Sequence, residues 1–152
     1  MATRPDILLF DREGRRLLVA EVKNKRNTTS RWAAELRRNL LAHEGFRHAE
    51  FFLVLTPDHL YLWKGASAEP VPVPPDFIVD SGPLFLPYLQ RAGLDLDRMS
   101  SPVFELMAIS WLSDLVHSRR ESETVVSDET WLVQSGLLDA VRNGRLAYEL
   151  AA

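Results

Sequence analysis

Asp6, Glu21 and Lys23 are the residues of this chain whose types and spacing could together perform chemistry. Carboxylates hold a hard divalent cation such as Mg²⁺ or Mn²⁺, and the bound cation lowers the pKa of a water ligand. A neighbouring lysine orients that water or stabilises charge that develops on a phosphate. The three side chains therefore suit metal-assisted hydrolysis of a phosphodiester. The alternative interpretation is a hairpin with ordinary edge charges.

Two apolar segments of strand length must position these residues. Residues 5–10 and 17–23 flank the polar, glycine-containing break 11–16, which predicts a β-hairpin. Both faces of the hairpin are apolar, as is typical of a sheet covered on both sides in an α/β protein. We expect Leu8, Phe10, Leu17 and Val19 on the face of Asp6, and Ile7, Leu9, Leu18 and Ala20 on the other.

The turn of this hairpin determines which side chains face each other. If Glu13 and Gly14 form the turn, residues whose numbers sum to 27 are paired, and Asp6 lies opposite Glu21. Directly opposed side chains lie roughly 4.5–5.5 Å apart at Cβ, so the two carboxylates repel each other unless a cation compensates them. Lys23 follows Glu21 by two residues and therefore projects from the same face of the strand.

Pro5-Asp6 together with Glu21-Val22-Lys23 resembles the PD-(D/E)xK motif of the restriction-endonuclease-like nucleases. The whole chain also looks similar to small stand-alone bacterial members of that superfamily. The resemblance implies that Asp6 and Glu21 bind magnesium or manganese, that the Val22 carbonyl is a third ligand, and that Lys23 is the catalytic lysine. It also implies a mixed central sheet flanked by helices, and nucleic acid as the substrate.

A helix is predicted from about Ser30 to Glu44, with Gly45 as its stop. In the resembled family the helix after the lysine strand flanks the active site. Polar residues on and before this helix are therefore candidates for contacts with phosphate or metal-bound water, whereas the alternative is a charged helix that faces solvent. The substrate-binding candidates are Lys25, Arg31, Arg38 and Asn39, and Glu35 is a supporting candidate.

The 152 residues are expected to form one domain with three parts. Residues 4–65 form the nuclease-like core of hairpin, helix and a second hairpin, with strands at 51–55 and 60–63. Residues 66–100 form a proline-rich connector with at most a short helix near 84–91. Residues 101–152 form a helical extension, with its main helix beginning at Ser101-Pro102 and a possible edge strand at 146–150.

The chain departs from the resembled family at its beginning. Members usually place a helix, often with a further acidic residue, and a strand before the Pro-Asp strand, whereas five residues precede Asp6 here. Glu105, on the helix that begins near Pro102, could supply the missing carboxylate. The other interpretation is that Glu105 is a first-turn residue that the helix dipole favours. A partner subunit could equally complete the site, and cleavage of a duplex, which needs two sites, suggests a two-fold dimer.

Charge is unevenly distributed along the chain. Residues 1–48 carry 11 Lys and Arg against 6 Asp and Glu, a net charge of +5, while the remainder has a net charge of −8. Basic residues around the candidate site are what phosphate binding requires, and a solvated basic face is the other explanation.

The chain contains no cysteine, which excludes disulfides and thiolate zinc sites. No leader-like segment or long apolar run is present, so a cytoplasmic protein without membrane contact is expected. Two hypotheses follow: a metal-dependent nuclease, or an inactive nuclease-like module that binds nucleic acid or a partner protein.

Overall fold

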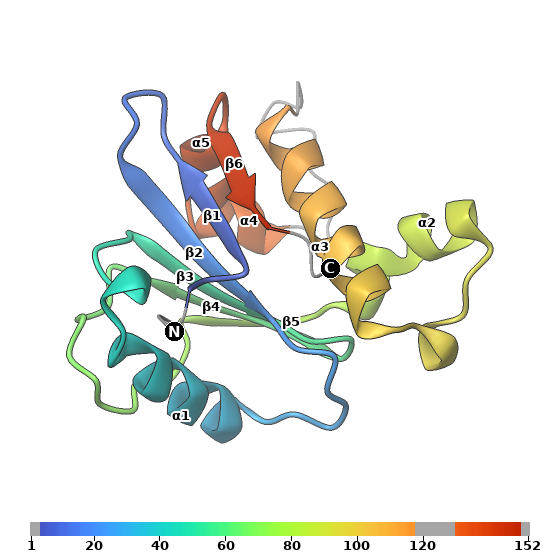
Figure 1. The fold of residues 1–152 in the computed structure, drawn as a ribbon, viewed down its shortest axis with the longest axis horizontal. Helices are drawn as coiled ribbons and strands as arrows, with labels where there is room; N and C mark the ends of the chain where they lie inside the picture. Colours follow the sequence, from blue (N-terminus) through green and yellow to red (C-terminus); the bar gives the residue numbers. More distant parts are fainter. Residues whose placement is uncertain (1–3, 118–129, 150–152) are drawn as a thin grey trace.

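The structure is a computed structural model that describes residues 4–117 and 130–149. A six-stranded mixed sheet with the order β5-β4-β3-β2-β1-β6 runs through its centre (Figure 1). Strands β2 and β3 are parallel, and the other neighbouring pairs are antiparallel. The strands are β1 (Ile7–Phe10), β2 (Arg16–Val22), β3 (Phe51–Leu55), β4 (His59–Lys64), β5 (Phe77–Asp80) and β6 (Arg145–Tyr148).

Helices cover both faces of this sheet. Helix α1 (Ser30–Leu41) makes the crossover between β2 and β3 and packs on one face, where Val19, Phe52 and Trp63 belong to its core. The other face carries a larger core and four helices: α2 (Gly82–Ala92), α3 (Ser101–Val116), α4 (Thr130–Gln134) and α5 (Leu137–Val141). Figure 1 shows α1 and α3 on opposite sides of the sheet. The predicted α/β class, with a mixed sheet between helices, is confirmed.

The predicted pairing of the first hairpin is also correct, although its turn is not. Ile7 pairs with Ala20, and the next pairs toward the turn likewise sum to 27, but Phe10 pairs with Arg16. The loop spans five residues, 11–15. Leu17 has no partner on β1 and forms a β-bulge between Arg16 and Leu18. This extra residue shifts the pairing by one position, so that the pairs beyond it have the predicted alignment. The bulge turns Leu17 into the core beneath α3, so its predicted position on the face of Asp6 was wrong.

Helix α1 begins where expected but ends earlier than predicted. The Thr29 side chain accepts a hydrogen bond from the Trp32 N–H at 3.1 Å and caps the first turn. The last residue is Leu41 rather than Glu44, and residues 44–46 form a separate 3₁₀ turn. The Arg47 guanidinium donates to the carbonyls of Leu41 and Ala42, at 2.7 and 3.3 Å. These bonds close the helix without help from Gly45.

The proline-rich segment ends in a strand that the sequence did not indicate. Strand β5 follows it directly and pairs with β4, because the N–H of Asp76 donates to the Leu62 carbonyl and the Asp76 carboxylate accepts from the Lys64 N–H. Helix α2 is longer than the short helix predicted at 84–91 and contains Pro87.

The helical extension largely agrees with the prediction. Helix α3 has Ser100, not Ser101, as its N-cap, and the predicted edge strand is β6, which pairs with β1. The predicted end of the main helix at Arg119 and Arg120, and the start of the next segment at 127–129, lie outside the described residues. Within the parts of the chain that are described, no helix is long and apolar enough to cross a membrane.

Candidate metal centre at the first hairpin

Asp6 and Glu21 meet at the open end of the β1–β2 hairpin. Asp6 immediately precedes β1, and its carboxylate accepts a hydrogen bond from the backbone N–H of Val22 at 2.8 Å. Continuing the strand pairing one step beyond Ile7 and Ala20 places Asp6 opposite Glu21. Glu21 lies on β2, inside the sheet, and is only 4% exposed.

The two carboxyl groups are coupled electrostatically. Burial raises the pKa of Glu21 to about 9, and a hydrogen bond to the Asp6 side chain and the negative charge of Asp6 act in the same direction. With this raised pKa, Glu21 is protonated at neutral pH.

Lys23 completes the predicted triad on the same strand face. Its Nζ lies 4.0 Å from Oε2 of Glu21, and its side chain is 45% exposed. The ammonium group opposes the effect of Asp6, because it lowers the pKa of Glu21. The triad therefore combines the buried Glu21 and the half-buried Asp6 with a lysine that reaches solvent.

Glu105 approaches this pair from helix α3. Burial and the charge of Asp6 both raise the pKa of Glu105, so the two carboxyl groups are within electrostatic reach of each other. The start of α3 is attached to the end of β2, because Asn24 Nδ2 donates to the Met99 carbonyl at 3.1 Å and Arg26 Nη2 to the Leu96 carbonyl at 2.7 Å. This attachment brings Glu105 near Asp6, as suggested from the sequence.

The side chains of the substrate-binding candidates mainly contact one another or neighbouring residues of α1. The Nζ of Lys25 lies 5.2 Å from the ring centre of Trp32, and Arg31 forms an ion pair with Glu35 at 3.4 Å. Arg38 Nε donates to the Asn39 side chain at 3.3 Å. Arg31 is 90% exposed. Among the described residues, no hydrogen bond or ion pair joins these side chains to the Asp6–Glu21 pair, although the Lys25 N–H donates to the Lys23 carbonyl at 2.9 Å. Their roles in substrate binding stay predictions.

Two hollows beside the pair contain residues that sequence reasoning did not select. Arg4, Pro5 and Leu8 line both hollows; one also includes Asp6 and Tyr148, and the other includes Arg16, His43 and His48. The guanidinium of Arg16 is held by the carbonyls of Gly45 and Arg47, at 2.9 and 3.2 Å. The only signal for these residues in the sequence is the basic charge of residues 1–48.

The donor set at the hairpin fits a hard divalent cation. Magnesium usually takes one or two carboxylates from the protein and keeps several waters, and two adjoining carboxyl groups of which one must lose a proton offer such a set. Nowhere in residues 4–117 and 130–149 do three or more His, Asp or Glu side chains form a group arranged to hold a metal ion. If a cation binds here, backbone oxygens and water would supply its other ligands.

Comparison of the chain with protein-family models, with curated proteins and with solved structures finds no match. The residues and their geometry are consequently the whole basis for a functional assignment.

Proposed function

We propose that the protein is a magnesium- or manganese-dependent nuclease that hydrolyses phosphodiester bonds of DNA or RNA. The observation that carries the proposal is the pairing of the buried Glu21 with the half-buried Asp6, in which burial of Glu21 and the nearby Asp6 raise the pKa of Glu21 to about 9. A buried carboxyl group with a perturbed pKa, next to a second carboxylate and a lysine, is a candidate for a functional site.

The proposed roles follow from the positions of the three side chains. Asp6 and Glu21 would hold the cation, with the Val22 carbonyl as a further candidate ligand. When bound, the cation supplies a water ligand of lowered pKa and an acid that polarises a phosphate oxygen. Glu21 must give up its proton to act as a ligand, and the ammonium group of Lys23, 4.0 Å away, favours that loss. Lys23 also reaches solvent, where it would contact a substrate phosphate.

The arrangement of the C-terminal elements supports the restriction-endonuclease-like interpretation. Strand β6 lies beside β1 and could take the place of the strand that precedes the Pro-Asp strand in the resembled family. Helix α3 carries Glu105 near Asp6, as the family's first helix often carries an acidic residue. We infer that the same parts are present in a rearranged chain order, with Glu105 as a supporting acidic residue.

The hollows beside the pair give the proposed substrate a path. Arg4, Arg16, His43 and His48 line them, and Glu44 and Glu149 add negative charge. Positively charged side chains along an open surface bind phosphates without selecting a sequence. One of the two hollows is lined by Asp6, and we expect this surface, in addition to Lys25, Arg31, Arg38 and Asn39, to contact the substrate backbone.

The decisive experiment is a cleavage assay with purified wild type and two matched variants. Glu21→Gln keeps the shape and hydrogen-bonding capacity of protonated Glu21 but cannot become a carboxylate, and Glu13→Gln makes the same change in the exposed hairpin loop. We expect single- or double-stranded DNA or RNA to be cleaved with Mg²⁺ or Mn²⁺ by the wild type and Glu13→Gln, and not by Glu21→Gln. Equal cleavage by all three would assign the activity to a contaminant.

The alternative function is a nuclease-like module that binds nucleic acid or a partner protein without cleaving. It is favoured by the observation that the described side chains form no group of three metal ligands. Retardation of DNA or RNA in a gel, without cleavage in Mg²⁺ or Mn²⁺, would support it. That a homodimer or a partner subunit supplies a remaining ligand stays a prediction. The mass of the active species in solution tests it.

A further inference from the structure

Arg37 of helix α1 is a buried cation whose hydrogen-bonding capacity is mostly unused. The residue is 2% exposed, and its Cζ lies over the rings of Phe52 and Trp63, at 5.5 and 5.6 Å from their centres. Its Nη2 donates to the Ser67 carbonyl at 2.8 Å. Its Nε and Nη1 are buried and have no hydrogen-bond partner, although such groups are almost always paired.

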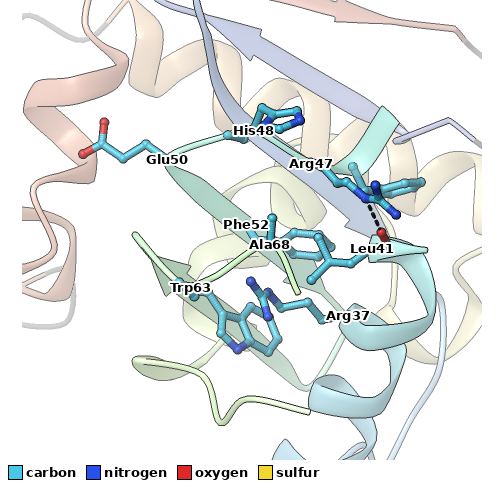
Figure 2. Close-up of a pocket in the computed structure, with 11 residues that line it drawn as sticks. Arg37, Leu41, Arg47, His48, Glu50, Phe52, Trp63 and Ala68 are labelled. Atoms are coloured by element: carbon cyan, nitrogen blue, oxygen red, sulfur yellow. Dashed lines mark hydrogen bonds between the residues drawn. The ribbon is translucent and has the colours of Figure 1, made fainter. Parts of the chain in front are cut away.

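Among the described residues, no acidic side chain forms an ion pair with Arg37. Desolvation lowers the pKa of Arg37, and the more distant charge of Asp76 only partly offsets that effect. The Asp76 carboxylate already accepts the Lys64 N–H. Glu50 lines the same pocket, but its carboxylate points away from the guanidinium group (Figure 2). A buried charge without a partner is strongly destabilising, so a further group is expected to compensate it.

The pocket at Arg37 is small and has a positive lining. Its free space of about 20 Å³ accommodates one water-sized atom. Arg47 and His48 contribute to the wall together with Phe52 and Trp63 (Figure 2), and Arg47 uses its Nε and Nη2 to cap α1. The aromatic rings stabilise the cation through their faces, but they offer no acceptor to the N–H groups at its edge.

We propose that this pocket binds a small anion, which places one atom, a halide or a single oxygen of an oxyanion, against the free N–H groups of Arg37. Water would satisfy the hydrogen bonds but not the charge, whereas an anion satisfies both. The bound anion would link α1 to β3, to β4 and to the segment around Ser67, and would stabilise the layer that covers the α1 face of the sheet. This inference is independent of the proposed nuclease activity, since the anion sits in a different pocket from that of Asp6 and Glu21.

Thermal unfolding of the whole protein in different salts tests the proposal. The probe anions are chloride and inorganic phosphate, each titrated at constant ionic strength against gluconate, which is too large for the pocket. For the wild type we expect the melting temperature to rise by roughly 2–5 °C and then saturate, as binding to the folded state requires. A response to chloride assigns a monatomic anion, and a response to phosphate alone assigns an oxyanion; either supports the proposal.

Two variants distinguish the pocket from general salt effects. Arg37→Met replaces the cation with an apolar side chain of similar length and should lose the anion response. Arg38→Met makes the same substitution at the next residue of α1, outside the pocket lining, and should keep it. An equal response in both variants would overturn the proposal.

Crystals of the wild type soaked in bromide give a direct test that does not depend on the stability of Arg37→Met. Bromide is identified by its anomalous scattering, and a peak within hydrogen-bond distance of Nε or Nη1 of Arg37 is expected. A cavity that holds only water both in crystals soaked in bromide and in crystals soaked in phosphate, or these anions found only on the outer surface as adventitious ions, would contradict the proposal.

Discussion

The Asp6 carboxylate accepts a hydrogen bond from the backbone N–H of Val22 at 2.8 Å, and this bond ties the residue before β1 to the last residue of β2. It fixes the Asp6 side chain at the end of the hairpin, beside the buried Glu21. The two carboxyl groups are therefore held together by the backbone of the sheet rather than by flexible loops. The predictions at this site concern what neutralises the pair.

The first prediction is that Glu21 makes stability fall as pH rises. The pKa of Glu21 is about 9 in the folded protein, against an ordinary value of 4.5. A raised carboxyl pKa means that the folded state holds the proton more tightly, so the stabilisation is complete below the ordinary pKa and is lost as pH rises through the folded value. Glu21→Gln, which never ionises, should match the wild type near pH 5 and exceed it above about pH 9, by an amount on the order of a few kcal/mol. Denaturant unfolding over this pH range measures the difference, and parallel curves for the two proteins would contradict the prediction.

The second prediction is that metal binding releases a proton. A cation bound by Asp6 and Glu21 must displace the proton that Glu21 holds at neutral pH. Manganese should therefore raise the melting temperature of the wild type more at about pH 8.5 than at about pH 6. Calorimetric titration in two buffers of different ionisation heat would show close to one proton released per metal ion. Asp6→Asn should lose most of the metal response, and a wild type indifferent to millimolar manganese would exclude the site.

The third prediction concerns Lys23. Because its positive charge lowers the pKa of Glu21, Lys23→Met should raise that pKa further and move the loss of stability to higher pH. Metal binding near neutral pH should weaken as a result, since more of Glu21 stays protonated. Lys25→Met removes a lysine that lies over Trp32 instead and should change neither property. The same unfolding and metal titrations measure both variants, and identical pH profiles for them would remove Lys23 from the site.

The sequence predicted the core of the candidate site because local rules determine it. Alternating side chains and a short polar break are sufficient to align Asp6 with Glu21 and Lys23. The turn was nevertheless misplaced, and the alignment survived only because the bulge at Leu17 compensates for the longer loop. Bulges depend on packing against α3, which the pattern of one hairpin does not contain.

Features that depend on distant parts of the chain were harder to predict. Strand β5 follows a run of prolines and forms because β4 offers it a free edge. The sequence did not predict that Arg37 is buried. The residue nevertheless has the helical spacing of the buried face of α1, which is formed by Ala33, Arg37, Leu40 and Leu41. A charged residue at such a position is conventionally assigned to the surface, and only the surrounding rings of β3 and β4 reveal that it is buried.

The last prediction concerns Gly144, the residue before β6. A Cβ atom at this position would lie 2.6 Å from the Phe10 carbonyl oxygen and 2.8 Å from a methyl group of Leu9, both on β1. Contacts this short force the backbone of one strand to move, so Gly144→Ala should lower the free energy of unfolding by about 1–3 kcal/mol. Strand β6 lies at the sheet edge next to β1, and β1 begins directly after Asp6, so the substitution should also weaken the response to manganese.

Gly82→Ala is the matched control, because its Cβ would meet no atom within 4 Å and the residue begins helix α2. Its stability should be unchanged or slightly higher, and a Gly144→Ala protein as stable as this control would show that β6 does not pack against β1 as closely as described.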